Sequence, residues 1–239
     1  MNAHPSQILQ GLTINVHNHG FVRLVDYMGT DQCIVEAARV SYHSGSKGEE
    51  QDKKLLRYLF VNKHTSPFEM AKIKFNIKMP IFVQRQFIRH RMQNFNEVSA
   101  RYTELSGEFF LPEAWRTNDG VKNKQVSQPT VWEKELHQEW NREIDEFYGK
   151  SYELYQRMLG AGIARELARM VLPVAIYTEF YSCWDLNNLL KYFFLRDDPH
   201  AQGEHQDYAR AMKEITKQLF PWTMEIYEET LAKKNAAKT

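Results

Sequence analysis

The sequence predicts an α+β fold, a helix-rich single domain with a small, mainly antiparallel sheet. Three observations predict it. Two stretches alternate apolar and polar residues as strands do, several longer segments space apolar residues three or four apart as helices do, and no internal repeat interrupts them. The chain has 239 residues, of which 43% are hydrophobic and 26% charged. A chain of this size and composition can bury a sizeable core, and residues 1–239 are expected to form one single domain.

The first third of the chain contains two strand segments and two helices. Residues 13–27 alternate and are rich in Val, Ile, Leu and Phe, which predicts two short strands broken at His19-Gly20. Asp31 is expected to cap a helix that ends near Arg39, and residues 44–48 form a polar loop. Helical spacing follows at residues 55–60, and a half-buried strand is predicted over residues 71–79.

The middle of the chain begins with a helix that starts at Pro80. On this helix Gln86, Arg89 and His90 would share one face. The pattern fades near Asn94, so residues 94–101 are expected in a loop. Residues 115–130 look like an exposed insertion with a turn at 118–120. A long amphipathic helix to Leu159 and a second helix over residues 164–170 follow.

The last third begins with a β-branched and aromatic segment at residues 174–184. This composition favours a strand, and a buried helix remains the alternative. Asp185 is predicted to cap a helix ending near Arg196. Two further helices are expected over residues 200–219 and 222–232, with a frayed tail at 232–239.

Composition excludes several classes of protein. No long uncharged apolar run or signal-peptide pattern occurs, so we expect a cytoplasmic protein with no membrane partner. Cys33 and Cys183 form no CxxC pattern and are expected to be buried thiols rather than a disulfide or zinc site. His200, Glu204 and His205 lack metal-ligand spacing, so no metal is expected. A glycine pair at Gly160-Ala161-Gly162 lacks the strand that a dinucleotide fingerprint requires, so any cofactor site would be of a non-Rossmann type.

Cations are concentrated in residues 84–102, where four Arg face one Glu in a chain whose total charge is +1. Such a local excess favours one discrete anion, and the planar guanidinium fork suits a phosphate. Apolar residues are interleaved with the arginines, so some guanidinium groups are expected near the core, and a structural ion-pair network remains an alternative. The near-neutral pI of about 7.8 argues against nucleic acid as the partner and favours a mononucleotide.

Four blocks of the sequence resemble motifs of the flavin-dependent thymidylate synthases. Residues 89–102 match R-H-R-x-x-S-x-N-E-x-S-x-R-Y, with Asn94 in place of the first Ser. His64 to Glu69 resembles H-x-[ST]-P-F-E, followed by Met70 where the family often has His. Residues 165–173 resemble R-E-x-A-R-x-x-L-P, and residues 195–202 resemble L-R-x-x-x-H-A-Q. The blocks span residues 64–202, and residues 37–41 add a weaker match.

The resemblance implies methylation of deoxyuridine monophosphate (dUMP) to thymidine monophosphate (dTMP). The implied one-carbon donor is 5,10-methylenetetrahydrofolate, and the implied hydride source is FAD reduced by NADPH. No enzyme cysteine would act as nucleophile. The family also implies a homotetramer whose sites lie between subunits. A non-catalytic nucleotide- or RNA-binding module is the leading alternative from another class.

Residue roles follow from the same resemblance. Arg196, facing the uracil ring, would be the catalytic residue. The nucleotide would be bound by Gln86, Arg89, Glu97, Val98, Ser99, Ala100, Arg101, Arg169 and Arg196. The flavin would be bound by His64, Ser66, Arg89, His90, Arg91, Glu97, Asp185, Leu186, Asn187 and Lys191. Of the last group, Asp185, Asn187 and Lys191 depart from the Asn, Arg and Asn of other members.

Overall fold

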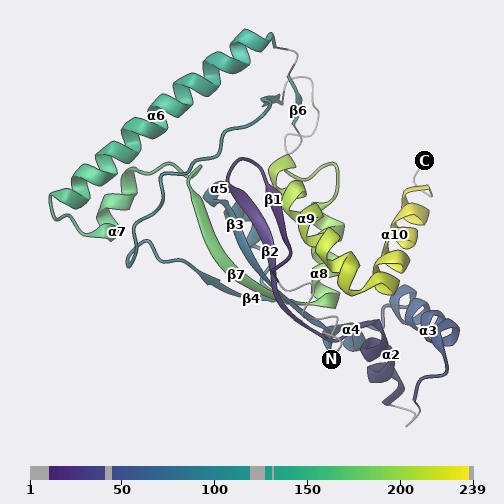
Figure 1. The fold of residues 1–239 in the computed structure, drawn as a ribbon. Coiled ribbons are helices and arrows are strands. Elements are labelled where there is room, and N and C mark those ends of the chain that lie inside the picture. The colour runs from purple at the N-terminus through teal and green to yellow at the C-terminus, as the bar shows by residue number, and fades with distance from the viewer. Residues whose placement is uncertain (1–10, 41–44, 119–126, 131, 237–239) are drawn as a thin grey trace.

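The computed structural model describes residues 11–40, 45–118, 127–130 and 132–236, and its centre is a five-stranded antiparallel sheet (Figure 1). The strands lie in the order β1-β2-β3-β7-β4. Their bounds are Thr13–Val16 for β1, Gly20–Met28 for β2, Lys72–Pro80 for β3, Gln93–Glu97 for β4 and Tyr177–Asp185 for β7. Every neighbouring pair is antiparallel, which confirms the predicted small sheet and the strand character of residues 177–184.

Helices account for most of the other described residues. They are α2 (Asp31–Arg39), α3 (Glu49–Val61), α4 (Ser66–Glu69), α5 (Ile81–Phe87), α6 (Lys134–Gly160), α7 (Arg165–Ala168), the 3-10 turn η2 (Arg169–Val171), α8 (Leu186–Arg196), α9 (Gly203–Leu219) and α10 (Pro221–Ala236). A short ladder joins β5 (Arg116–Thr117) to β6 (Gln128–Pro129). No helix among the described residues is both long and apolar enough to cross a membrane.

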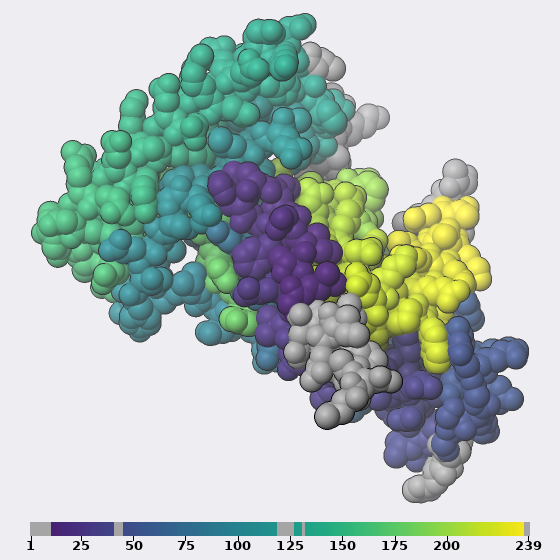
Figure 2. Space-filling view, in the orientation of Figure 1, coloured from purple at the N-terminus to yellow at the C-terminus, as the bar shows by residue number. Residues whose placement is uncertain are grey.

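The main core lies between one face of the sheet and helices α8 and α9. Alternate residues of the strands, such as Leu24, Phe75 and Ile77, point toward these helices, which contribute Phe193 and Met212. All five side chains are fully buried. Helices α2, α3, α4 and α10 gather at one end of the sheet, and α6 lies at the other (Figure 1). The space-filling view shows the same division, with α6 and residues near 100–115 forming one flank (Figure 2).

The start of α2 differs from the prediction, because its N-cap is Thr30 rather than Asp31. The Thr30 side chain accepts a hydrogen bond from the Cys33 amide. Asp31 is the first helical residue, and its carboxylate is buried against the start of α10, where it accepts hydrogen bonds from the Trp222 and Thr223 amides. Asp31 therefore caps a distant helix rather than its own.

The region predicted as one helix and a loop is arranged differently. Helix α5 ends at Phe87, so Arg89 and His90 lie in the turn that follows it. The predicted loop contains strand β4, which pairs along its full length with β7, from Gln93 beside Trp184 to Glu97 beside Phe180. Because this strand is short and polar, its alternation does not reveal its pairing partner.

Both cysteines were expected to be buried, and this is wrong: Cys33 is exposed and Cys183 is partly exposed. The buried face of α2 contains Asp31, Ile34, Val35 and Arg39, and this spacing places Cys33 on the opposite side. On β7 the fully buried Ser182 and Trp184 face the core, so Cys183 between them points to the other face of the sheet.

The remaining elements follow the prediction with shifted ends. Helix α6 begins at Lys134, and the second helix of that region splits into α7 and η2. Helix α10 continues to Ala236, so residues 232–236 are helical, while 237–239 lie outside the described residues. The turn predicted at 118–120 also lies largely outside them. Asp185 caps α8 as predicted, accepting a hydrogen bond from the Asn188 amide at 2.9 Å.

Candidate functional site

Arg196, the last residue of α8, meets His90 in the turn after α5. The Arg196 Nε donates a hydrogen bond to His90 Nε2 at 2.9 Å. The edge of the His90 ring packs against Tyr192, with ring centroids 4.9 Å apart. Burial, and then the charge of Arg196, lowers the pKa of His90 to about 4. The imidazole is therefore neutral at pH 7, as its role as acceptor requires.

A second histidine, His205 of α9, lies behind this pair and is fully buried. Its Nε2 lies 3.1 Å from the Tyr192 hydroxyl, and burial, with a smaller effect from Arg196, lowers its pKa to about 3. The aromatic ring of Phe87 contacts Tyr192 and His205 from the other side. Arg196 thus rests on an apolar, aromatic layer containing two uncharged imidazoles. Sequence patterns did not identify His205 or Tyr192 as part of this layer.

Glu97 ends strand β4 and is held by two donors. Gln84 Nε2 donates to one carboxylate oxygen at 2.9 Å, and the Thr178 hydroxyl donates to the other at 2.6 Å. Gln84 is buried on α5 and occupies no motif position, so no signal in the sequence indicated its contact with Glu97. The neighbouring residue Val98 is exposed, and its amide donates to the Glu179 carbonyl at 2.9 Å, which continues the strand into the next loop.

Ser99, Ala100 and Arg101 form a tight turn after β4. The Arg101 amide donates to the Ser99 hydroxyl oxygen at 3.3 Å, and Ala100 is buried against Leu105 and Phe109. The Arg101 guanidinium extends outward and pairs with Glu166 of α7 at 3.0 Å, with both side chains about half exposed. Arg169 follows in η2 and is exposed. The ion pair links the turn that carries Arg101 to the segment that carries Arg169.

The other arginines of the cluster are exposed. Arg85, Arg89 and Arg91 all have exposed side chains, and Gln86 is half-buried. We expected some guanidinium groups near the core, and these three do not lie there. Arg85 lies on the exposed side of α5, and α5 ends before Arg89 and Arg91. Apolar Met92 beside them is also 67% exposed. This surface combines cations that form no ion pair with any other residue in the described part of the chain and exposed apolar side chains.

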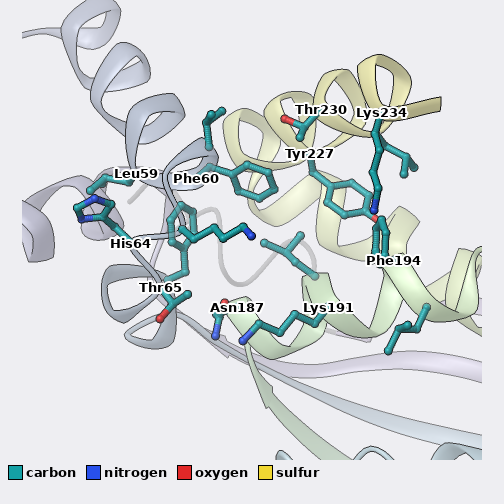
Figure 3. A pocket seen from close by; sticks show the side chains of 16 residues that line it. Leu59, Phe60, His64, Thr65, Asn187, Lys191, Phe194, Tyr227, Thr230 and Lys234 are labelled. Atoms are coloured by element: carbon teal, nitrogen blue, oxygen red, sulfur yellow. The ribbon is translucent and has the colours of Figure 1, made fainter. Parts of the chain in front are cut away.

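A third group of predicted residues lines an apolar cavity of about 720 Å³ between α3, α4, α8 and α10 (Figure 3). Asn187 and Lys191 extend from α8 toward it, with Tyr227 and Lys234 of α10 on the facing wall (Figure 3). His64 lies at its edge, at the end of α3. The Asn187 amide also donates to Glu69 at 3.4 Å.

Seven of the ten predicted flavin residues do not line this cavity. Four of them, Arg89, His90, Arg91 and Glu97, lie in the regions described above. Ser66 is exposed at the start of α4, Leu186 is fully buried in the main core, and the Asp185 carboxylate bonds Asn188. Most of the predicted residues therefore fall into three groups. These are the Arg196–His90 pair, the Glu97-to-Arg101 turn facing α7, and the cavity beside α8.

Comparison with known proteins gives a family for this arrangement. The model of the family described as thymidylate synthase complementing protein matches residues 23–222. This span contains every predicted site residue. The chain belongs to the flavin-dependent thymidylate synthase family.

Its relatives in this family are similar over most of their length. The flavin-dependent thymidylate synthase of Thermus thermophilus is 48% identical over 220 residues, covering 92% of this chain and 80% of that protein. The enzyme of Kosmotoga olearia is 47% identical, with 90% of this chain and 93% of that protein covered. A UMP/dUMP methylase from Streptomyces cacaoi, solved with 5-Br dUMP, has a TM-score of 0.81 at 33% identity, covering 90% of this chain and 97% of that one.

Proposed function

We propose that this chain methylates dUMP to dTMP, with 5,10-methylenetetrahydrofolate as carbon donor and FAD reduced by NADPH as hydride source. The observation that carries the proposal is the pairing of β4 with β7, in a chain of this family. This pairing brings the arginine-rich motif beside the C-terminal end of α8, where Arg196 lies. It also agrees with the structural similarity to a methylase solved with a dUMP analogue.

The nucleotide is assigned to the groups at β4 and α7. Arg101 and Arg169 supply exposed cations for the phosphate, and Ser99 supplies a hydroxyl in the same turn. The other residues assigned to the nucleotide are Gln86, Arg89, Glu97, Val98 and Ala100. Ala100 is buried, so it contributes through its backbone rather than its side chain. Glu97, already held by Gln84 and Thr178, fixes the position of this backbone.

Arg196 is assigned to the pyrimidine ring as the catalytic residue. A guanidinium beside the ring N3 and a carbonyl stabilises negative charge on the ring, which makes C5 more nucleophilic without a covalent enzyme adduct. The cysteines agree with this assignment. Cys33 is on the exposed face of α2, and Cys183 points to the face of the sheet opposite the core that supports Arg196.

The cavity beside α8 fits part of a flavin dinucleotide. Its apolar walls suit an aromatic ring system, and Lys63, Lys191 and Lys234 supply cations for a diphosphate. The buried Tyr227 hydroxyl, which has no hydrogen-bond partner among the described residues, adds a polar group on the cavity wall. Bound FAD would supply the hydride. Besides His64, Asn187 and Lys191 at the cavity, we assign to it Ser66, Arg89, His90, Arg91, Glu97, Asp185 and Leu186, the last two through the start of α8.

A homotetramer with sites between subunits is part of the proposal. Several residues assigned to dUMP and to FAD, among them Arg89, Arg101 and Arg169, are exposed in one chain. Apolar Tyr102 and Met170 next to them are 80% and 75% exposed. A site finished by a second subunit explains both facts, because isolated monomers seldom leave large apolar side chains uncovered around a binding site.

The proposal is tested with the purified protein. It should carry flavin absorbance, and NADPH should reduce this flavin under anaerobic conditions at a rate that dUMP alters. Arg101→Ala and Arg196→Ala should lose the response to dUMP, whereas Arg142→Ala, an exposed arginine of α6, should keep it. A colourless protein that also fails to bind added FAD would overturn the proposal.

A further inference from the structure

Arg196 differs from the other paired arginines near the site in the kind of partner it has. Arg101 pairs with Glu166 and Arg210 pairs with Asp197, so a carboxylate neutralises each of them. Arg196 donates its Nε to an imidazole, and no carboxylate among the described residues forms an ion pair with it. An arginine held by a neutral acceptor keeps its full positive charge.

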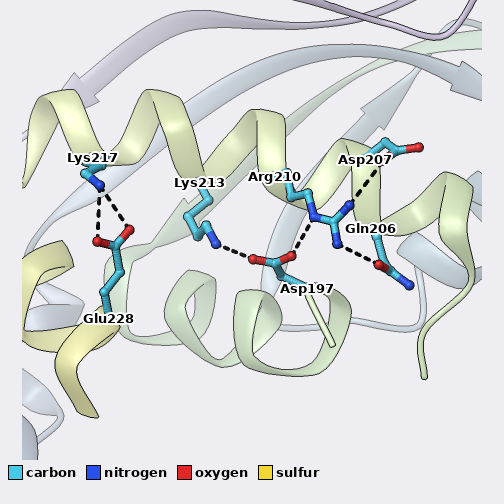
Figure 4. A network of polar contacts seen from close by, with 7 residues as sticks. All are labelled: Asp197, Gln206, Asp207, Arg210, Lys213, Lys217 and Glu228. Atoms are coloured by element: carbon cyan, nitrogen blue, oxygen red, sulfur yellow. Dashed lines mark hydrogen bonds and ion pairs between the residues drawn. The ribbon is translucent and has the colours of Figure 1, made fainter. Parts of the chain in front are cut away.

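The carboxylate that follows Arg196 in the sequence is paired with other cations. Asp197 follows it directly, and its two oxygens are occupied by Arg210 at 2.8 Å and by Lys213, both on α9 (Figure 4). The Asp197 side chain is only 12% exposed. Two cations therefore engage this carboxylate on the α9 side, which keeps it from neutralising Arg196.

The position of His90 is fixed independently of Arg196. Gln93 Nε2 donates to the His90 carbonyl at 2.9 Å, and Gln93 Oε1 accepts from the Ser182 hydroxyl. Ser182 in turn accepts from the Trp184 indole at 2.6 Å. This chain of hydrogen bonds ties the turn after α5 to the centre of β7. The backbone of His90 is thus held in place, and its imidazole packs against Trp184, Tyr192 and His205, which restricts its movement with the arginine.

We propose that His90 is a positioning residue for Arg196, a neutral acceptor that holds the guanidinium by its Nε and leaves both terminal amino groups and the full charge for the bound pyrimidine. This inference rests on the proposed function, which places Arg196 beside that ring. A carboxylate at the same place would hold the guanidinium equally well, but it would cancel the charge that the ring requires.

Three substitutions separate these roles. His90→Gln keeps an acceptor oxygen, His90→Phe keeps a ring without an acceptor, and His90→Glu adds an acceptor that is negatively charged. We expect the smallest loss of kcat for Gln, and losses of about a hundredfold for Phe and for Glu, all measured with FAD at saturation because the proposed function also places His90 beside the flavin. Glu equal to Gln, Phe equal to wild type, or wild-type kcat restored in all three variants by added FAD would overturn the proposal; the last outcome would make His90 a cofactor contact alone.

The pairing itself is tested in the protein without nucleotide, by NMR of histidine labelled with ¹⁵N. The His90 signal, assigned by its absence in His90→Gln, should show Nε2 without a proton and a titration midpoint below 5. The charged and titratable groups around it are Arg196 and Tyr192 of α8, His205 of α9, and Arg89 and Arg91 of its own turn.

Arg196→Gln should raise the His90 midpoint, because it removes the positive charge that disfavours protonation. A midpoint near 6.5 that does not respond to Arg196→Gln would overturn the pairing. This result does not depend on activity, so failure of the pairing and failure of the proposed function are distinguishable.

Discussion

The carboxylate of Asp31 connects the start of α2 to the start of α10, and its removal should destabilise the protein measurably. One oxygen accepts from the Thr223 amide at 3.0 Å and the Thr223 hydroxyl at 2.5 Å, and the other accepts from the Trp222 amide at 2.8 Å. Helix α10 begins at Pro221, so both amides belong to its first turn and have no partner within the helix.

The size of the effect follows from these contacts. Asp31→Ala leaves two amides in a site where Asp31 is only 5% exposed. An unsatisfied buried donor costs about 1–3 kcal/mol. Removing the buried carboxylate recovers part of this, because burial raises the pKa of Asp31 and its charged form is costly there. We therefore expect the free energy of unfolding to fall by about 2–3 kcal/mol. This equals or exceeds the largest losses that follow removal of a helix cap.

Urea denaturation at one fixed protein concentration measures this change. Gln32→Ala is the matched control, since Gln32 is the next residue of α2 and is exposed. The control should change the free energy of unfolding by less than about 0.5 kcal/mol. A result for Asp31→Ala within that margin of the control would refute the reasoning.

Three further outcomes are expected. Gly20→Ala should severely reduce the yield of folded protein, because a Cβ there would lie 2.6 Å from the Val16 carbonyl oxygen. Gly149→Ala on α6 is the control: its Cβ would meet no atom within 4 Å, so this variant should have a higher melting temperature. Glu166→Gln should tighten dUMP binding in calorimetry by up to about fivefold, since it frees Arg101 from a half-exposed pair worth at most about 1 kcal/mol; weaker binding would contradict this. The free energy of unfolding should fall as pH drops from 6.5 toward 4. In that window the unfolded chain binds more protons than the folded chain, because the pKa values of His90 and His205 in the folded protein are lowered to about 4 and about 3. Urea midpoints at pH 7 and 5 test the slope, which His205→Phe should reduce.

Local signals in the sequence predicted the elements that depend on local contacts. The cap at Asp185 and the end of α8 at Arg196 follow from neighbouring residues, and the structure confirms both. Strand β3 was likewise predicted from its alternation, which reflects one buried face. These features need no knowledge of a partner segment.

The missed features depend on distant partners. Strand β4 is defined by β7, whose residues lie more than eighty positions later in the chain, and Asp31 is defined by Thr223 at a separation of 192. The contact between His90 and Arg196 joins residues 106 positions apart. The motif resemblance indicated that these residues act together, but the hydrogen bond and the neutral state of His90 required the fold.

The C-terminal half of the long helix α6 contacts two backbone segments that carry site arginines, and this has a consequence for ligand affinity. The Ser151 hydroxyl donates to the Val171 carbonyl of η2, and the Tyr152 hydroxyl donates to the Leu105 carbonyl. The backbone segments that carry Arg169 and Arg101 are therefore bonded to adjacent residues of the same helix. Substitutions in α6 would alter the distance between the two guanidinium groups, and hence the affinity for a phosphate, without contacting the phosphate.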